Sequence, residues 1–305
     1  MTGNLLTEAR NPASARIDTL PTDRIVAIIN DEDAKVPPAV RAVLPQISSA
    51  VDAVTYALQN GGKLFYIGAG TSGRLGVLDA SECPPTFNVA PDLVQGIIAG
   101  GAEALSRATE ASEDDRESGV RDLVARQFSA RDVLCGIAAS GRTPYVLGAI
   151  AKAKELGATT IGISCTPQSE LSAAVQIPIE VLTGPEVVTG STRMKAGTAT
   201  KLVLNTISTA VMIRLGHVYG NLMVNVRPKN DKLRDRALRI IRDATDANET
   251  RAAQLFEQSA GDVRTAIIMG LCRISREEAS ALLASQGGSI RASLALLPST
   301  DNPKR

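Results

Sequence analysis

Three short stretches combine glycine with hydroxyl-bearing side chains, the composition of a loop that binds phosphate. Glycine lets the backbone approach a ligand closely, and hydroxyl and backbone N–H groups donate hydrogen bonds to an anion. The first stretch follows the apolar run 64–67, and its candidate ligands are Gly70, Thr71 and Ser72. The second gives the candidates Ser140, Gly141, Arg142 and Thr143. The third, which opens a long apolar helix, gives Ser191, Thr192 and Lys195.

The elements around these stretches predict an α/β fold with a doubly wound parallel sheet. Short apolar runs are typical of buried strands, and segments with helical periodicity alternate with them. In a parallel sheet the turns from strand to helix lie at the carboxyl ends of the strands, where ligands bind. We therefore expect the first two stretches to lie side by side and to hold a phosphate monoester. The predicted strands are 64–67, 93–99, 133–139, 159–165 and 175–181.

The rest of the chain predicts helices. Residues 1–53 form an N-terminal helical segment, in which a helix expected from Pro37 onward continues as one long apolar face to Leu58. Residues 54–217 form the phosphate-binding domain, and residues 225–305 a small all-helical domain. Asp246 and Ser275 are expected to be helix N-caps there. The expected C-terminal helices are 231–244, 249–258, 263–271, 275–285 and 289–297.

Two alternatives to a phosphate-monoester site stay open at this point. The hydroxyl groups could simply cap their helices, which is their commonest structural role. The spacing Gly68-x-Gly70-x-x-Gly73 also matches the dinucleotide-binding fingerprint, which needs an acidic residue about 20 positions on, at the end of the second strand. Asp92 lies near that distance but precedes the strand, so the nucleotide alternative is the weaker one.

Composition excludes several classes of protein. The net charge of +1 favours neither nucleic acid nor an anionic membrane surface as a partner. The four cysteines are dispersed without a Cys-x-x-Cys pair, which favours a reducing, cytoplasmic setting. His217 is the only histidine, so neither a multi-histidine metal site nor a serine–histidine–acid triad is expected. We expect no metal and no cofactor.

Among the many carboxylates, Glu82 stands out. We expect it in a rigid turn of low charge after the helix that follows the first stretch, because Pro84 and Pro85 restrict the backbone behind it. Glu113 is harder to single out, because four other acidic residues crowd around it. Charge alone indicates that this second run is a solvated face.

Longer motifs resemble a known family. Residues 68–86 read GAGTSGRLGVLDASECPPT, residues 136–145 read GIAASGRTPY, and residues 186–198 read EVVTGSTRMKAGT. Together with GNLM at 220–223 and IINDED at 28–33, they resemble the N-acetylmuramic acid 6-phosphate etherases. This family belongs to the sugar isomerase (SIS) group of phosphosugar-binding domains, so the resemblance implies a flavodoxin-like sheet.

The resemblance implies cytoplasmic bacterial enzymes, usually homodimers, that recycle cell-wall sugar. They are lyases that cleave the D-lactyl ether of N-acetylmuramic acid 6-phosphate, giving N-acetylglucosamine 6-phosphate and D-lactate. The family's two acid/base glutamates fall on Glu82 and Glu113, and this resemblance alone raises Glu113 above its neighbours. The alternative is a non-catalytic phosphosugar sensor, because related glucokinase regulators share the architecture.

The expected chemistry makes a demand on the site. A carboxyl group that donates a proton near neutral pH must have a raised pKa, which a poorly solvated pocket provides. We therefore expect Glu82, as the proton donor to lactate, to lie in such a pocket. The ether is expected to break by elimination across C2–C3 of the ring-opened sugar, followed by addition of water to C3. Glu113 is then the expected base that removes the C2 proton.

Overall fold

The computed structural model describes residues 6–107, 112–226 and 230–296. Its centre is a five-stranded parallel sheet in the order β2-β1-β3-β4-β5, the flavodoxin-like order. The predicted α/β class with a doubly wound parallel sheet is therefore confirmed. Four predicted strands contain an observed one, and β1 extends one residue beyond the predicted 64–67. The observed bounds are β1 Leu64–Gly68, β2 Val94–Ile98, β3 Val133–Ile137, β4 Thr159–Ser164 and β5 Ile177–Glu180.

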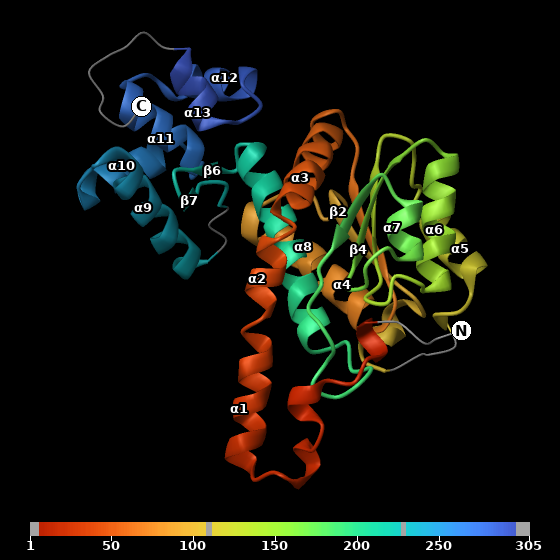
Figure 1. The fold of residues 1–305 in the computed structure, drawn as a ribbon. Helices are drawn as coiled ribbons and strands as arrows, with labels where there is room; N and C mark the ends of the chain where they lie inside the picture. Colours follow the sequence, from red (N-terminus) through yellow and green to blue (C-terminus); the bar gives the residue numbers. More distant parts are fainter. Residues whose placement is uncertain (1–5, 108–111, 227–229, 297–305) are drawn as a thin grey trace. The chain divides into compact units, whose positions relative to one another are not determined.

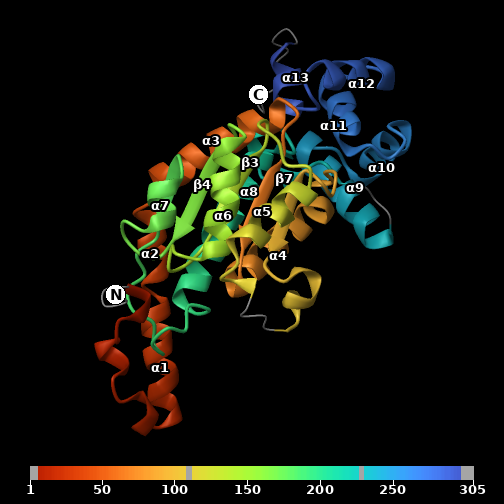
Figure 2. The ribbon, with the colours of Figure 1, turned by 90° about the vertical axis from the view of Figure 1, so that its right-hand side faces the viewer.

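Helices cover both faces of the sheet (Figures 1 and 2). One face packs against α5 (Arg116–Ala125), α6 (Pro144–Glu155) and α7 (Glu170–Ala174), through a core that includes Phe65 and Leu134. The other face is covered by α3 (Leu44–Gln59), α4 (Gly70–Phe87) and α8 (Lys195–Arg214). Burial on both faces explains why the strands read as continuous apolar runs rather than alternating patterns.

The loop between β1 and α4 is shorter than we expected, because α4 begins at Gly70 and includes Thr71 and Ser72. Gly70 has a φ of +51°, in the left-handed region that favours glycine. The helix also continues to Phe87 with Pro84 and Pro85 inside it. The expectation of a turn around Glu82 was therefore wrong, and this glutamate lies within the helix.

The N-terminal segment consists of η1 (Leu6–Glu8), η2 (Pro12–Ser14), η3 (Ile17–Thr19), α1 (Thr22–Asp33), α2 (Val36–Arg41) and the start of α3. The long helix expected from Pro37 to Leu58 is divided, since α2 ends at Arg41 and α3 begins at Leu44. Pro45 is the cause, because it has no N–H and its ring clashes with the carbonyl of residue 41 in a continuous helix. The short helix α7 was not predicted.

The C-terminal helices agree closely with their predicted positions. A hairpin of β6 (Val218–Tyr219) and β7 (Leu222–Met223) comes first. The helices that follow are α9 Asp231–Thr245, α10 Glu249–Gln258, α11 Val263–Cys272, α12 Arg276–Ser285 and α13 Ile290–Ala295. Ser275 caps α12 in a capping box, as predicted. Asp246 instead ends α9 with a φ of +53°, and Asn248 is the N-cap of α10.

The chain divides into two compact units. One comprises Met1–Glu82 and Pro91–Thr209, and the other comprises Cys83–Ala90 and Ala210–Arg305. The second unit has its own core of aliphatic side chains around Ile241 and Ile267. The predicted limits 1–53, 54–217 and 225–305 differ from this division and stay a prediction.

Helices α5 and α6 approach each other closely through two glycines. A Cβ atom on Gly119 would lie 2.0 Å from the carbonyl oxygen of Tyr145, and one on Gly148 would lie 2.2 Å from that of Arg116. Both contacts are to backbone, which cannot move aside as a flexible side chain can. The pair therefore sets the position of the segment before α5, where Glu113 lies.

We predict that Gly119→Ala lowers the free energy of unfolding by about 1–3 kcal/mol, because the added methyl group overpacks the contact between the two helices. Chemical denaturation measures this loss. Val124→Ala, which truncates an exposed side chain on the same helix, is the control and should change stability little. Equal stability of Gly119→Ala and the wild type would contradict the close contact.

Candidate active site

The first two glycine-rich stretches meet at one edge of the sheet. β1 and β3 are hydrogen-bonded neighbours in register, with Gly68 opposite Ile137, so the turns after them begin at the same level. In the order β2-β1-β3-β4-β5, the chain adds β2 on one side of β1 and β3 on the other. The strand order therefore reverses at the carboxyl ends of β1 and β3. Ligands of open α/β sheets bind at this point.

A close backbone contact shapes the first turn. A Cβ atom on Gly73 would lie 2.6 Å from the carbonyl oxygen of Gly68, so the strand end and the helix start touch. Thr71 and Ser72 are half-buried in the first turn of α4, where N–H groups and the helix dipole favour an anion. The Thr71 methyl carbon would lie 3.5 Å from a Cβ atom on Gly197, which brings the first turn close to the third.

The second turn offers a different set of groups. Ser140 is half-buried, and its hydroxyl accepts a hydrogen bond of 3.4 Å from the N–H of Arg142. Gly141 is buried with a φ of +68°, and Arg142 is exposed at the rim. Thr143 occupies the N-cap position of α6, but its side chain makes no capping hydrogen bond.

Glu113 lies beside this second turn. The Thr143 hydroxyl donates a hydrogen bond of 3.0 Å to Oε1 of Glu113, and the Tyr145 N–H donates one of 3.1 Å to the Glu113 carbonyl. The glutamate itself is exposed. The structure therefore brings together Glu113 and the predicted loop 140–143, which are about 30 residues apart in the sequence.

Glu82 lies on the same face of α4 as Thr71. It is eleven residues further on, which corresponds to three turns plus about 20° and to about 17 Å along the axis. Leu75 and Leu78 lie between them on this face, and Leu78 is 52% exposed. Glu82 is also exposed, so one chain by itself does not provide the poorly solvated pocket that we expected.

Two carboxylates that were not predicted contact the start of α8: Glu186 from the segment before it and Glu32 from α1. Glu186 is 1% exposed and accepts hydrogen bonds from the N–H groups of Lys195 and Ala196 at 3.0 and 2.9 Å. It thereby fills the start of α8, where an anion would otherwise bind. Glu32 is 2% exposed and lies 2.6 Å from the Lys195 ammonium group.

The buried ion pair between Lys195 and Glu32 affects both partners: it limits the access of Lys195 to a ligand and lowers the pKa of Glu32. Lys195 is 1% exposed, so it would have to leave Glu32 to bind a phosphate directly. Burial by itself would raise the pKa of Glu32, but hydrogen bonds from Lys195 and Lys35 outweigh it and lower the pKa to about 2. Ser191 and Thr192 are half-buried in the turn before α8. A ligand role for Lys195 stays a prediction.

No metal site emerges from the part of the chain that the structure describes, since it holds no cluster of three potential ligands among His, Cys, Asp and Glu. His217 is half-buried and its Nδ1 lies 2.9 Å from the side-chain nitrogen of Asn225. Burial and the charge of Arg264 lower its pKa. Within residues 6–107, 112–226 and 230–296, no helix is long and apolar enough to span a membrane.

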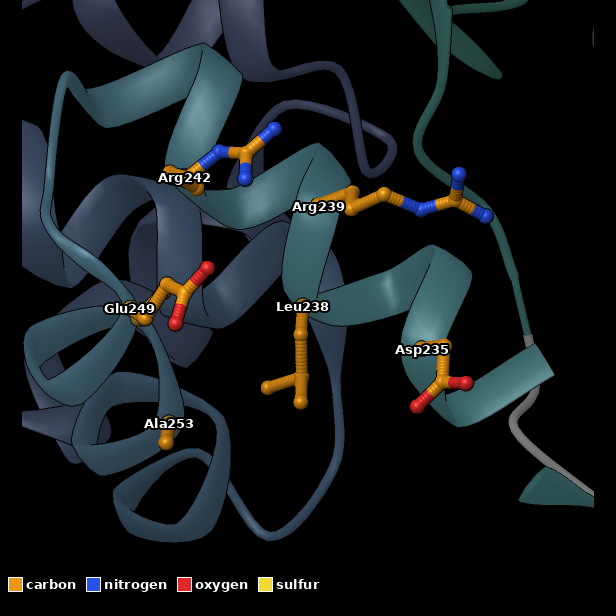
Figure 3. Close-up of a pocket in the computed structure, with 7 residues that line it drawn as sticks. Asp235, Leu238, Arg239, Arg242, Glu249 and Ala253 are labelled. Atoms are coloured by element: carbon orange, nitrogen blue, oxygen red, sulfur yellow. The ribbon is translucent and has the colours of Figure 1, made fainter. Parts of the chain in front are cut away.

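A groove of about 570 Å³ lies elsewhere, between α9 and α10 of the second unit (Figure 3). Leu238 and Ala253 form part of its wall, with Arg239, Arg242 and Glu249 around it. None of the predicted site residues lines this groove. The candidate active site is therefore the edge of the sheet and not the groove.

Comparisons with known proteins agree with this fold. A family model described as the glucokinase regulatory protein N-terminal SIS domain matches residues 46–154. The crystal structure of an inferred phosphosugar isomerase involved in capsule formation, from Bacteroides fragilis NCTC 9343, superposes with a TM-score of 0.50 at 19% identity. The superposition covers 65% of this chain and 94% of that one. The first unit is thus an α/β domain of the SIS class.

Sequence relatives define the family more narrowly. An N-acetylmuramic acid 6-phosphate etherase from Photorhabdus laumondii is 53% identical over 288 residues, covering 94% of this chain and 96% of that protein. Another, from Photobacterium profundum, is 55% identical over 292 residues, covering 96% and 97%. The chain belongs to the N-acetylmuramic acid 6-phosphate etherase family.

We predict that Glu32→Gln destabilises the protein by about 3–5 kcal/mol at neutral pH, because it leaves the Lys195 charge buried without its partner. The pKa of Glu32 is lower in the folded than in the unfolded protein, so its contribution is complete above about 4.5 and is lost as the pH falls towards about 2. Denaturation of both proteins over this range should show their difference shrinking.

The matched control for this prediction is Glu155→Gln, which removes an exposed pair with Lys152. Exposed pairs contribute about 0–1 kcal/mol, so little change is expected. If Glu32→Gln were as stable as Glu155→Gln, the buried pair would not stabilise the turn.

Proposed function

We propose that this protein is an enzyme that cleaves the D-lactyl ether of N-acetylmuramic acid 6-phosphate with water. The products are N-acetylglucosamine 6-phosphate and D-lactate, as expected in the recycling of cell-wall sugar. The observation that carries the proposal is the identity of 53–55% to etherases over nearly the whole chain. The geometry of the sheet edge supports it, because two turns with glycine and hydroxyl groups lie together there with the Glu113 carboxylate.

The phosphate is held, in this proposal, between the turns after β1 and β3. The hydroxyl groups of Thr71, Ser72 and Ser140 and the N–H group of Gly70 donate to its oxygens, and Arg142 supplies a positive charge. Gly141 shapes the second turn, because its own N–H already donates to the Ala138 carbonyl at 2.9 Å. The third turn contributes differently, because Glu186 already occupies the first N–H groups of α8. Ser191 and Thr192 are left as its candidate ligands.

Elimination followed by addition of water explains how an unactivated ether is broken. In the ring-opened sugar the C2 hydrogen is α to the aldehyde, and its acidity permits removal by a carboxylate. Glu113 takes this proton as the C2–C3 double bond forms and the bond from C3 to the lactyl oxygen breaks. Glu82, in its protonated form, gives its proton to that oxygen, and D-lactate leaves.

The second half restores the sugar. The Glu82 carboxylate takes a proton from water, whose oxygen adds to C3, and Glu113 returns its proton to C2. Each carboxyl group ends in its starting state, so the net reaction consumes one water. For Glu82 to remain protonated near neutral pH, the exposed carboxyl group must be covered when substrate is bound. The substrate itself or a second subunit supplies that cover.

Homodimeric assembly and a cytoplasmic location are part of the proposal. The face of α4 that carries half-buried Leu75 and the exposed Leu78 and Glu82 supports the dimer, because apolar surface that remains accessible favours association. The dispersed cysteines support a reducing compartment.

A non-catalytic sensor of phosphosugars is the alternative. The match to the regulatory protein's domain covers residues 46–154, whereas the etherases match nearly the whole chain. The full-length relationship therefore favours the enzyme.

Turnover in deuterated water tests the reaction. We expect release of D-lactate together with N-acetylglucosamine 6-phosphate that carries deuterium at C2, because the abstracted proton exchanges with solvent. Product mass and NMR spectra measure the label. Lactate release without label at C2 contradicts elimination, and binding of substrate without any lactate release supports the sensor.

We predict that Glu82→Gln lowers kcat by about 100-fold or more, because an amide cannot donate the proton that lactate needs. The rate of lactate formation is the measurement. Glu155→Gln, which changes an exposed glutamate of the same unit, is the control and should keep normal activity. Near-normal turnover by Glu82→Gln would exclude Glu82 as the acid.

A further inference from the structure

The Thr143 hydroxyl is directed to a carboxylate and not to a ligand. Thr143 stands at the N-cap of α6, where a threonine usually accepts a hydrogen bond from its helix, yet its side chain makes none. It donates instead to Oε1 of Glu113 at 3.0 Å. With 6% of the residue exposed, Thr143 also has little surface left for a phosphate.

The backbone on both sides of this hydrogen bond is held in place. The Tyr145 N–H donates to the Glu113 carbonyl at 3.1 Å, which ties the two segments a second time. The Tyr145 hydroxyl donates to Asp122 of α5 at 2.6 Å, and burial with this hydrogen bond raises the pKa of Tyr145, so that its proton stays in place. Gly119 and Gly148 then keep α5 and α6 in backbone contact.

This arrangement leaves the two oxygens of the Glu113 carboxylate unequal. Oε1 accepts from Thr143, which restricts rotation of an exposed and otherwise mobile side chain. Oε2 accepts no hydrogen bond from the described residues, so its lone pairs are open to a proton from the substrate. A base held in one orientation reacts faster than one that samples many, since the cost of ordering it is met before the substrate binds.

We propose that Thr143 is a positioning residue that orients Glu113 for removal of the C2 proton, and that it does not bind the phosphate. This inference rests on the proposed function, in which Glu113 is the base. It separates Thr143 from Ser140, three residues earlier in the same turn, whose half-buried hydroxyl has no carboxylate partner among the described residues.

The test compares Thr143→Val, Thr143→Ser and Ser140→Ala in the full-length enzyme. We expect Thr143→Val to lower kcat by about 10- to 100-fold with little change in KM, because orientation is lost and phosphate binding is not. The isotope effect on kcat for substrate deuterated at C2 should rise, since proton removal becomes slower. Thr143→Ser keeps the hydroxyl and should restore kcat, whereas Ser140→Ala should raise KM.

Thr55→Val is the matched control for a buried threonine. Thr55 is 4% exposed, and its hydroxyl has no hydrogen-bond partner in the described part of the chain. The same substitution there should leave kcat, KM and the isotope effect unchanged. Thr143→Ala repeats the comparison should the valine variant fail to fold, as judged from its thermal unfolding.

A double substitution separates action through Glu113 from any other role. In a Glu113→Gln background, Thr143→Val should cause no further loss of the residual activity, because the group that it orients is gone. An additive loss would overturn the inference, as would a higher KM with unchanged kcat or normal kinetics of Thr143→Val. Absence of lactate release by the wild type would instead overturn the proposed function.

Discussion

The structure depends on the parallel pairing of β1 with β3. Because Gly68 lies opposite Ile137, two turns that are about 70 residues apart in the chain start at the same level of one edge. Everything proposed for the site follows from this pairing: the first turn brings hydroxyl groups and a helix start, and the second brings Ser140 and the neighbours of Glu113. A shift of the register by one residue would separate them and turn the buried side chains to the opposite face.

The first N–H groups of α8 and α4 differ in whether a carboxylate of the protein binds them. At α8 the chain supplies its own anion, because the buried Glu186 accepts from the first two N–H groups. At α4 no carboxylate hydrogen bond to the first turn is found within the described residues, and Thr71 and Ser72 are partly accessible. A similar sequence pattern, glycine and hydroxyl groups at a helix start, thus produces N–H groups that bind an internal carboxylate in one place and an open turn in the other.

The sheet and the C-terminal helices could be predicted because their signals are local. A short apolar run identifies a buried strand, and Ser275 with Glu278 forms a capping box within four residues. The start of α4 could not be predicted, since glycine, threonine and serine have low helix propensity and the contact of Gly73 with Gly68 overrides it. The partners of Lys195 and Thr143 were missed because Glu32 and Glu113 are 163 and 30 residues away.

Because Thr71 and Glu82 share one face of α4, the number of residues between them fixes the direction of Glu82 around the helix axis more strictly than its distance along that axis. One residue inserted between them would move the glutamate about 1.5 Å along the axis but turn it about 100° around it. A deletion would turn it as far in the other direction. The helix therefore tolerates substitutions along its exposed side more readily than any change in its number of residues.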